Sequence, residues 1–211
     1  RIVEPPVLAR WYLFAVAYIA AIKVAAAVVH RLVTGAWPAF GATPLVIMAG
    51  AILISTPVQA GEEIGWRGYA LPRLAARIGL GPAGIVLGVV WGAWHLPFFF
   101  MPGADTYGQS FPLYLLQVTA LSVAMAWLYW RANGMLLPLM VMHAAVNNTK
   151  DIVPSAMPGA TDPLTLTATP VGWLTVALLW LCGAYLLVSI RRAGVAARAR
   201  AATPQAERAT T

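Results

Sequence analysis

The sequence is poor in charged residues, and this scarcity indicates its class. Only 10% of its 211 residues are charged, whereas 60% are hydrophobic. A soluble domain usually carries about a quarter charged residues. So few charges cannot coat a water-facing surface of this size, but a lipid bilayer needs no such coat because its core is hydrocarbon. The composition therefore predicts an integral membrane protein.

The sequence also has little cysteine and no pattern typical of nucleic-acid binding. The single cysteine, Cys182, excludes a disulfide within this sequence and a zinc site built from several thiolates. We interpret it as a small hydrophobic residue of its apolar segment. The net charge of +7 comes from residues at the ends of apolar segments, which is typical of membrane orientation and not of nucleic-acid binding. The first apolar segment has no small-residue cleavage site, so we expect no signal peptide.

Six apolar segments predict about six transmembrane helices, and hence an all-α polytopic bundle. They cover residues 11–33, 43–60, 82–100, 111–130, 135–149 and 170–190, and the second continues as a less apolar stretch to residue 74. Most approach the roughly 20 residues that span the hydrocarbon core. The fifth is short, so its ends need shielding by neighbouring helices.

Positive residues are distributed unevenly between the two sides of this bundle. One set of connections contains Arg73, Arg77 and Arg131, and the tail after residue 190 adds five arginines. The opposite set contains Lys150 and, as its only arginine, Arg31. The positive-inside rule therefore predicts that both termini are cytoplasmic.

The domain organisation follows from these segments. We expect a single transmembrane domain over residues 1–190, with the functional motifs in a core of about 43–150. Residues 191–211 are rich in alanine and arginine. We expect them to form a disordered cytoplasmic tail near anionic lipid.

Ionisable groups inside membrane helices are costly and therefore suggest function. Glu63 and Arg67 are four residues apart, with the acid first, which favours an ion pair on a helix. Glu62 is rotated by about 100° from Glu63 and has no cation at that spacing. A salt-bridged helix end explains Glu63 and Arg67, but it does not explain Glu62. Lys23 and His30 are interpreted as structural, by snorkelling and by proximity to a helix end.

Two histidines stand in comparable settings on later segments. His95 follows Trp91 by four residues, and His143 precedes Asn147 by four, so each pair shares a helix face. Either histidine alone is explained as well by packing or by interhelical hydrogen bonding. Together with Glu62, however, three helices supply a carboxylate, two imidazoles and an amide. Peptide hydrolysis needs such groups, because a base must activate water and donors must stabilise the oxyanion.

Three motifs follow one another along the chain: Glu62-Glu63-x-x-x-Arg67, Trp91-x-x-x-His95 and His143-x-x-x-Asn147. In this order they resemble the motifs of the CPBP family. These proteins are intramembrane glutamic endopeptidases, named for CAAX proteases and bacteriocin-processing enzymes and also called Abi proteins. The resemblance covers roughly residues 59–148, under half of the chain.

The resemblance implies roles for four catalytic residues. It implies that Glu62 activates a water molecule with help from His95, and that His143 and Asn147 form the oxyanion hole. We expect desolvation among the helices to let Glu62 take a proton from water near neutral pH. Helix rise alone places His143 deeper in the membrane than Glu62, so a tilt or a shifted helix boundary is needed to bring them together.

The resemblance also implies supporting residues and surroundings. Glu63 and Arg67 hold the first motif in shape, while Trp91 replaces the phenylalanine that the family usually has there. Family members imply a peptide or protein substrate, including membrane-tethered ones, together with the lipid bilayer and no nucleic acid. We expect no cofactor, and we expect the protein in a bacterial cell membrane.

Other functions compete with this interpretation. A metal-dependent protease could use Glu62, His95 and His143 as ligands of a divalent ion, although the His-Glu-x-x-His motif is missing. A non-hydrolytic transporter or immunity protein could use the same polar residues, although no internal repeat supports a transporter.

A rhomboid-type serine protease is not favoured either. Ser55, Ser110 and Ser122 lack a Gly-x-Ser-x-Gly setting, and none is paired with a histidine by position.

Overall fold

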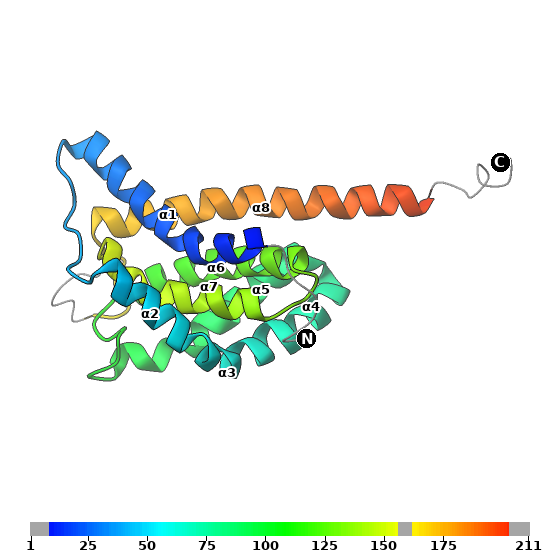
Figure 1. The fold of residues 1–211 in the computed structure, drawn as a ribbon, viewed down its shortest axis with the longest axis horizontal. Coiled ribbons are helices and arrows are strands. Elements are labelled where there is room, and N and C mark those ends of the chain that lie inside the picture. Colours follow the sequence, from blue (N-terminus) through cyan, green and yellow to red (C-terminus); the bar gives the residue numbers. More distant parts are fainter. Residues whose placement is uncertain (1–8, 156–161, 203–211) are drawn as a thin grey trace, which may run out of the picture.

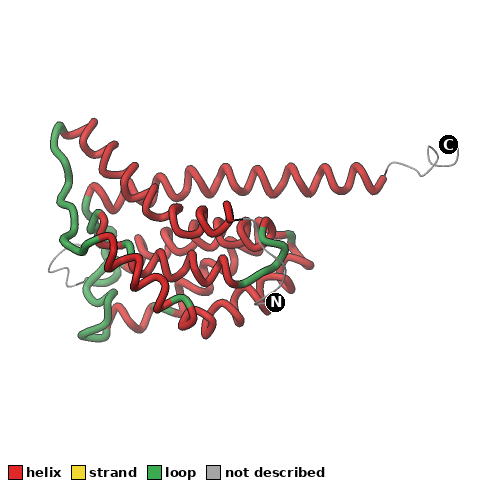
Figure 2. The backbone as a smooth tube through the Cα atoms, in the orientation of Figure 1, coloured by secondary structure: helices red, strands yellow, loops and turns green. Residues whose placement is uncertain are grey.

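The computed structural model describes residues 9–155 and 162–202, with side chains as far as residue 195. Within this part of the chain there are helices and connecting loops but no strand (Figure 2). The α-helices are α1 (Ala9–Thr34), α2 (Leu45–Ser55), α3 (Ala60–Glu63), α4 (Leu71–Ile78), α5 (Leu80–Trp94), α6 (Phe111–Arg131), α7 (Leu137–Asn148) and α8 (Pro170–Ala202). Short 3₁₀ or π segments are η1 (Pro57–Gln59), η2 (Ile64–Ala70), η3 (Leu96–Phe100) and η4 (Lys150–Ile152). The predicted all-α fold is confirmed.

Helix α6 lies at the centre of the bundle. It packs against α5 on one side and α8 on another, while α1 packs against α7 and α8, and α2 packs against α7 (Figure 1). The close contact between α5 and α6 depends on Gly88, because a Cβ there would lie 2.7 Å from the Cα of Thr119 and 2.8 Å from the Cβ of Ser122. Small residues at a helix interface are a common means of association in membranes.

Four helical stretches are long and apolar enough to cross a membrane, and a fifth qualifies if α2 and the bent stretch Pro57–Ile78 count as one. Many of their large apolar side chains face outward; Leu53 and Ile54 of α2 are 76% and 80% exposed. Such a surface suits lipid and not water. The protein is therefore an integral membrane protein. The count of six crossings stays a prediction, since α7 has only 12 residues. The cytoplasmic termini and the bacterial membrane also stay predictions.

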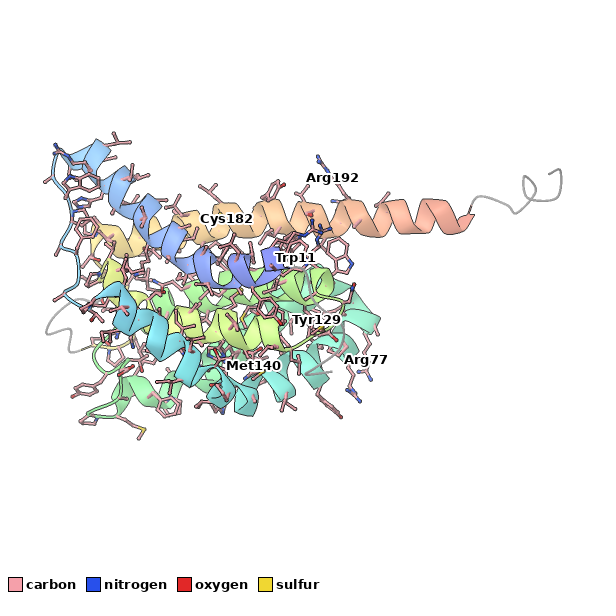
Figure 3. The ribbon with its side chains drawn as sticks, in the orientation of Figure 1. Trp11, Arg77, Tyr129, Met140, Cys182 and Arg192 are labelled. Atoms are coloured by element: carbon pink, nitrogen blue, oxygen red, sulfur yellow. The ribbon has the colours of Figure 1, made fainter. Side chains whose placement is uncertain are left out.

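The tail differs from the expectation. Helix α8 continues through Arg191 and Arg192 as far as Ala202, so the first part of the segment expected to be disordered is helical. Alanine and arginine are strong helix formers, which explains the extension. Residues 203–211 lie outside the described part of the chain. Figure 3 places Arg77 and Arg192 toward the same end of the molecule, as the uneven charge distribution predicts.

The second apolar segment is broken where the first motif begins. It bends by 42° between Ser55 and Pro57. Helix α3 then passes into the π segment η2, in which the amide of Leu71 donates to the carbonyl of Trp66, five residues back. Pro72 follows at once; its ring crowds the preceding helical turn and it has no N–H to donate. π turns of this kind occur often at functional sites.

Candidate active site

The first motif and the third motif meet at Glu63. Its Oε1 atom accepts hydrogen bonds from Nη1 of Arg67 at 2.9 Å and from Nδ1 of His143 at 2.8 Å. Arg67 and Glu63 have no exposed side-chain surface, and His143 has 4%. The ion pair predicted from the four-residue spacing is thus confirmed, and the structure adds His143 to it.

Glu62 has a separate environment, as its position on the helix predicted. Its Oε2 atom accepts a hydrogen bond from Nε1 of Trp91 at 2.7 Å. None of the ion pairs between described residues includes Glu62. Its side chain is only partly buried, so a carboxylate oxygen remains for a further partner.

His95 lies at the C-terminal end of α5, directly after Trp94. Its Nδ1 atom is 2.8 Å from the backbone carbonyl of Trp91. A carbonyl oxygen can only accept, so Nδ1 must carry the hydrogen of this bond. In the neutral ring, Nε2 is therefore an acceptor, which is the form in which a histidine acts as a base.

Trp91 connects all three motifs. Its ring centroid lies 5.9 Å from that of His95 and 5.2 Å from that of His143, both in edge-to-face geometry. The guanidinium carbon of Arg67 lies 4.3 Å from the ring centroid. The indole N–H of Trp91 also binds Glu62. Both imidazoles therefore lie beside Trp91, the residue that binds the Glu62 carboxylate. The structure thus brings the first and third motifs together, which the rise of straight helices did not predict.

The two asparagines of α7 differ in environment. Asn147 is exposed, and its amide makes no hydrogen bond to a described residue, although it lies one turn from His143. Asn148 instead donates to Oγ of Ser55 at 2.9 Å and to the carbonyl of Ala144 at 2.8 Å. Asn148 is therefore a packing residue, and Asn147 has a free amide.

Tyr114 of α6 is a neighbour of the site that the sequence did not indicate. Its ring centroid lies 5.4 Å from that of His95 and 5.1 Å from that of Phe99. The residue stands in a long apolar helix and belongs to none of the three motifs, so the sequence did not single it out.

The remaining polar residues of the spans have structural roles. Lys23 is buried and donates to the carbonyl of Val153 at 3.1 Å and to Oγ of Ser155 at 2.9 Å, which fastens α1 to the loop after η4. His30 is partly buried, and its Nδ1 lies 3.0 Å from the carbonyl of Ala36. Both residues are structural, as expected, but Lys23 does not snorkel, because it is buried and its ammonium is bound within the protein. Cys182 packs against the apolar core.

The serines are likewise accounted for. Ser110 caps α6 by accepting from the amide of Leu113 at 3.2 Å, Ser55 accepts from Asn148, and Ser122 is 1% exposed against α5. Over residues 9–155 and 162–202, no three His, Cys, Asp or Glu side chains are grouped so that they could hold a metal ion.

The sequence of this region matches a known family. Residues 41–149, more than half of the chain, match the model described as type II CAAX prenyl endopeptidase Rce1-like. A stretch of 98 residues is 26% identical to CAAX prenyl protease 2 of Methanococcus maripaludis, covering 44% of this chain and 36% of that protein. The match thus spans little more than a third of that relative's length. The region matched by the family model includes Trp91 and the three residues around its indole ring, which are Glu62, His95 and His143. The chain belongs to the Rce1-like family of type II CAAX prenyl endopeptidases.

Proposed function

We propose that this protein is an intramembrane endopeptidase that hydrolyses a peptide bond with a water molecule activated by Glu62. One observation supports the proposal above the others. Glu62 lies outside the buried Glu63–Arg67 ion pair and is bound by Trp91, whose ring lies beside the rings of His95 and His143. A carboxylate outside any ion pair, bound to an indole that also contacts two imidazoles, is suited to proton transfer.

Water activation uses two acceptors, the second carboxylate oxygen of Glu62 and Nε2 of His95. One oxygen of Glu62 is occupied by the indole N–H, which leaves the other to accept a proton from water. Nε2 of His95 accepts the second hydrogen of that water and orients it, because Nδ1 is engaged by the carbonyl of Trp91. The water oxygen then forms a bond to the carbonyl carbon of the substrate. When the carbon–nitrogen bond breaks, Glu62 returns its proton to the leaving amine.

His143 and Asn147 stabilise the oxyanion in this mechanism. Nδ1 of His143 is bound to Glu63, so only Nε2 faces a substrate. Nε2 donates only if the ring carries both hydrogens, so this role requires the charged form of His143. An oxyanion donor of this kind is typically worth about 3–4 kcal/mol of transition-state stabilisation.

The substrate proposed is a peptide segment held at the membrane by a lipid. The relative from Methanococcus maripaludis is described as a CAAX prenyl protease. The outward faces of the spans are apolar, as a protein immersed in lipid requires. A lipid-anchored peptide is concentrated at this surface, so it reaches the site by diffusion within the bilayer.

Reconstitution in liposomes tests the proposal. The protein is mixed with prenylated and unprenylated peptides that end in a CAAX sequence, and the products are identified by mass spectrometry. We expect cleavage by the wild type and none by Glu62→Gln, since the amide cannot take the proton. Asp105→Asn is the matched control, because this carboxylate is exposed and pairs with Lys150, which belongs to none of the three motifs. Cleavage by Glu62→Gln at the wild-type rate would contradict the mechanism.

A further inference from the structure

We propose that Trp91 is a positioning residue for Glu62, and that its indole N–H holds the carboxylate in the orientation that activates water. This inference rests on the proposed peptidase function and adds a residue to it. Trp91 replaces the phenylalanine that resembling proteins usually have at this position. Phenylalanine offers a similar ring face but has no hydrogen-bond donor.

The hydrogen bond itself is strong by its geometry. Nε1 of Trp91 lies 2.7 Å from Oε2 of Glu62, a short distance typical of bonds to an ionised acceptor. Trp91 is 3% exposed, so water does not compete well for its N–H. The indole can only donate, and therefore it fixes one carboxylate oxygen and leaves the other to bind water.

The ring is held on several sides. Arg67 covers one face, and the imidazoles of His95 and His143 lie in edge-to-face geometry with the ring. Arg67 is in turn fixed by Glu63. The indole therefore has little freedom to turn its N–H away from Glu62.

Arg67 also affects the strength of the hydrogen bond. A cation over an aromatic face attracts the ring's electron density. Polarisation of this kind makes the N–H a stronger donor, just as hydrogen bonds in a chain polarise one another in a protein interior of low dielectric constant. The charge of Arg67 thus reaches Glu62 through the ring, although no ion pair joins the two residues.

Loss of the N–H has two expected consequences. The carboxylate becomes free to rotate, so cleavage slows by roughly 10- to 100-fold, the range for a lost hydrogen bond to a charged group. A hydrogen bond to the charged form also favours that form, so its loss makes protonation easier. We therefore expect the acid side of the pH–rate profile to move to higher pH.

Two variants of Trp91 test the inference. Trp91→Phe installs the ring that lacks a donor. Replacement of Trp91 by its benzothiophene analogue, in which sulfur takes the place of the N–H, keeps the size and shape of the ring. We expect both to show the slower rate and the shifted acid side. If Trp91→Phe fails to fold, the shape-matched analogue decides.

Trp127→Phe is the matched control. Its indole N–H also donates to a side chain, Oγ of Ser189 at 3.3 Å, but its ring packs against Trp11 and Phe14 away from the site. We expect an unchanged pH profile in this variant. A benzothiophene analogue with the rate and pH profile of the wild type would overturn the inference, because the N–H would then be dispensable.

The outcomes separate this inference from the proposed function. An inactive wild type, or an active Glu62→Gln, contradicts the peptidase mechanism itself. An active wild type with inactive Glu62→Gln and an unaffected analogue contradicts only the role of Trp91. A rate loss without a change in the pH profile assigns Trp91 to packing and also overturns the inference.

Discussion

Nδ1 of His143 and Oε1 of Glu63 are 2.8 Å apart, although the two residues are 80 positions apart in the sequence. The contact joins α7 to the end of α3, and it uses the same oxygen that binds Arg67. This oxygen therefore controls two features at once. It neutralises a buried guanidinium, and it determines which nitrogen of His143 remains for a substrate.

Glu63→Gln tests this double role. We expect a loss of unfolding free energy of about 3–5 kcal/mol, because a fully buried Arg67 loses its counter-charge. Thermal unfolding in detergent measures the stability, and peptide cleavage measures the activity. Exchange of both residues, Glu63→Gln with Arg67→Met, should restore part of the stability but not the activity, since His143 still lacks its charged partner. Equal stability of the single and double variants would contradict the expectation.

Asn147 and Asn148 offer a matched comparison on α7. Asn147→Ala should slow cleavage by about 10²–10³-fold, as for the loss of one oxyanion donor. Its stability should stay within about 0.5 kcal/mol of the wild type, because the side chain is exposed and makes no bond to a described residue. Kinetics and thermal unfolding of the same preparations provide both values.

Asn148→Ala should show the opposite pattern. It removes the bond to Ser55, so we expect lower stability by about 1 kcal/mol and near-normal cleavage below the unfolding temperature. If Asn148→Ala and not Asn147→Ala abolished cleavage, the assignment of the oxyanion donor would be wrong.

Gly88→Ala tests the close contact of α5 and α6. The new methyl group would lie under 3 Å from the backbone of Thr119, so the helices must separate. We expect a loss of about 1–3 kcal/mol in unfolding free energy. Gly183→Ala of α8 is the control, because a Cβ there meets nothing within 4 Å. Similar stability changes in both variants would show that helix propensity and not packing dominates.

The pair of Asp105 and Lys150 predicts a pH-dependent contribution outside the spans. The hydrogen bond from Lys150, together with its charge, lowers the pKa of Asp105. The pair therefore stabilises the fold above the unfolded pKa of about 3.9, and the effect is lost as pH falls through the lower folded value. Both side chains are well exposed, so Asp105→Asn should cost less than about 1 kcal/mol at pH 7. Unfolding curves at pH 7 and pH 3 check that the difference between variant and wild type shrinks in acid.

Removal of divalent ions distinguishes the metal-free mechanism from a metal-dependent one. We expect cleavage to survive prolonged dialysis against chelators, because Glu62 and His95 supply the bases. A metal-dependent protease would lose activity and regain it with zinc or another divalent ion. Activity before and after chelation, with the metal content of the sample, is the measurement.

The sequence determined the class of the protein and the residues of its motifs. Scarce charge and long apolar segments require a bilayer, and the bounds of α1 and α6 differ by only a few residues from the segments predicted. The spacing of Glu63 and Arg67 determined their ion pair, because a helix brings residues four apart to one face. It also separated Glu62 from that pair. All of these are local properties of the chain.

Only the tertiary structure decided how the motifs meet. His143 of the short helix α7 contacts Glu63 at the end of α3, beyond the bend after Ser55, although straight helices were expected to place them at different depths. The bond from Trp91 to Glu62 likewise joins two helices. Residue spacing fixes contacts within a helix because the rise per residue is constant. Contacts between helices depend instead on bends, crossing angles and close approach, and the chain sets these only when it packs.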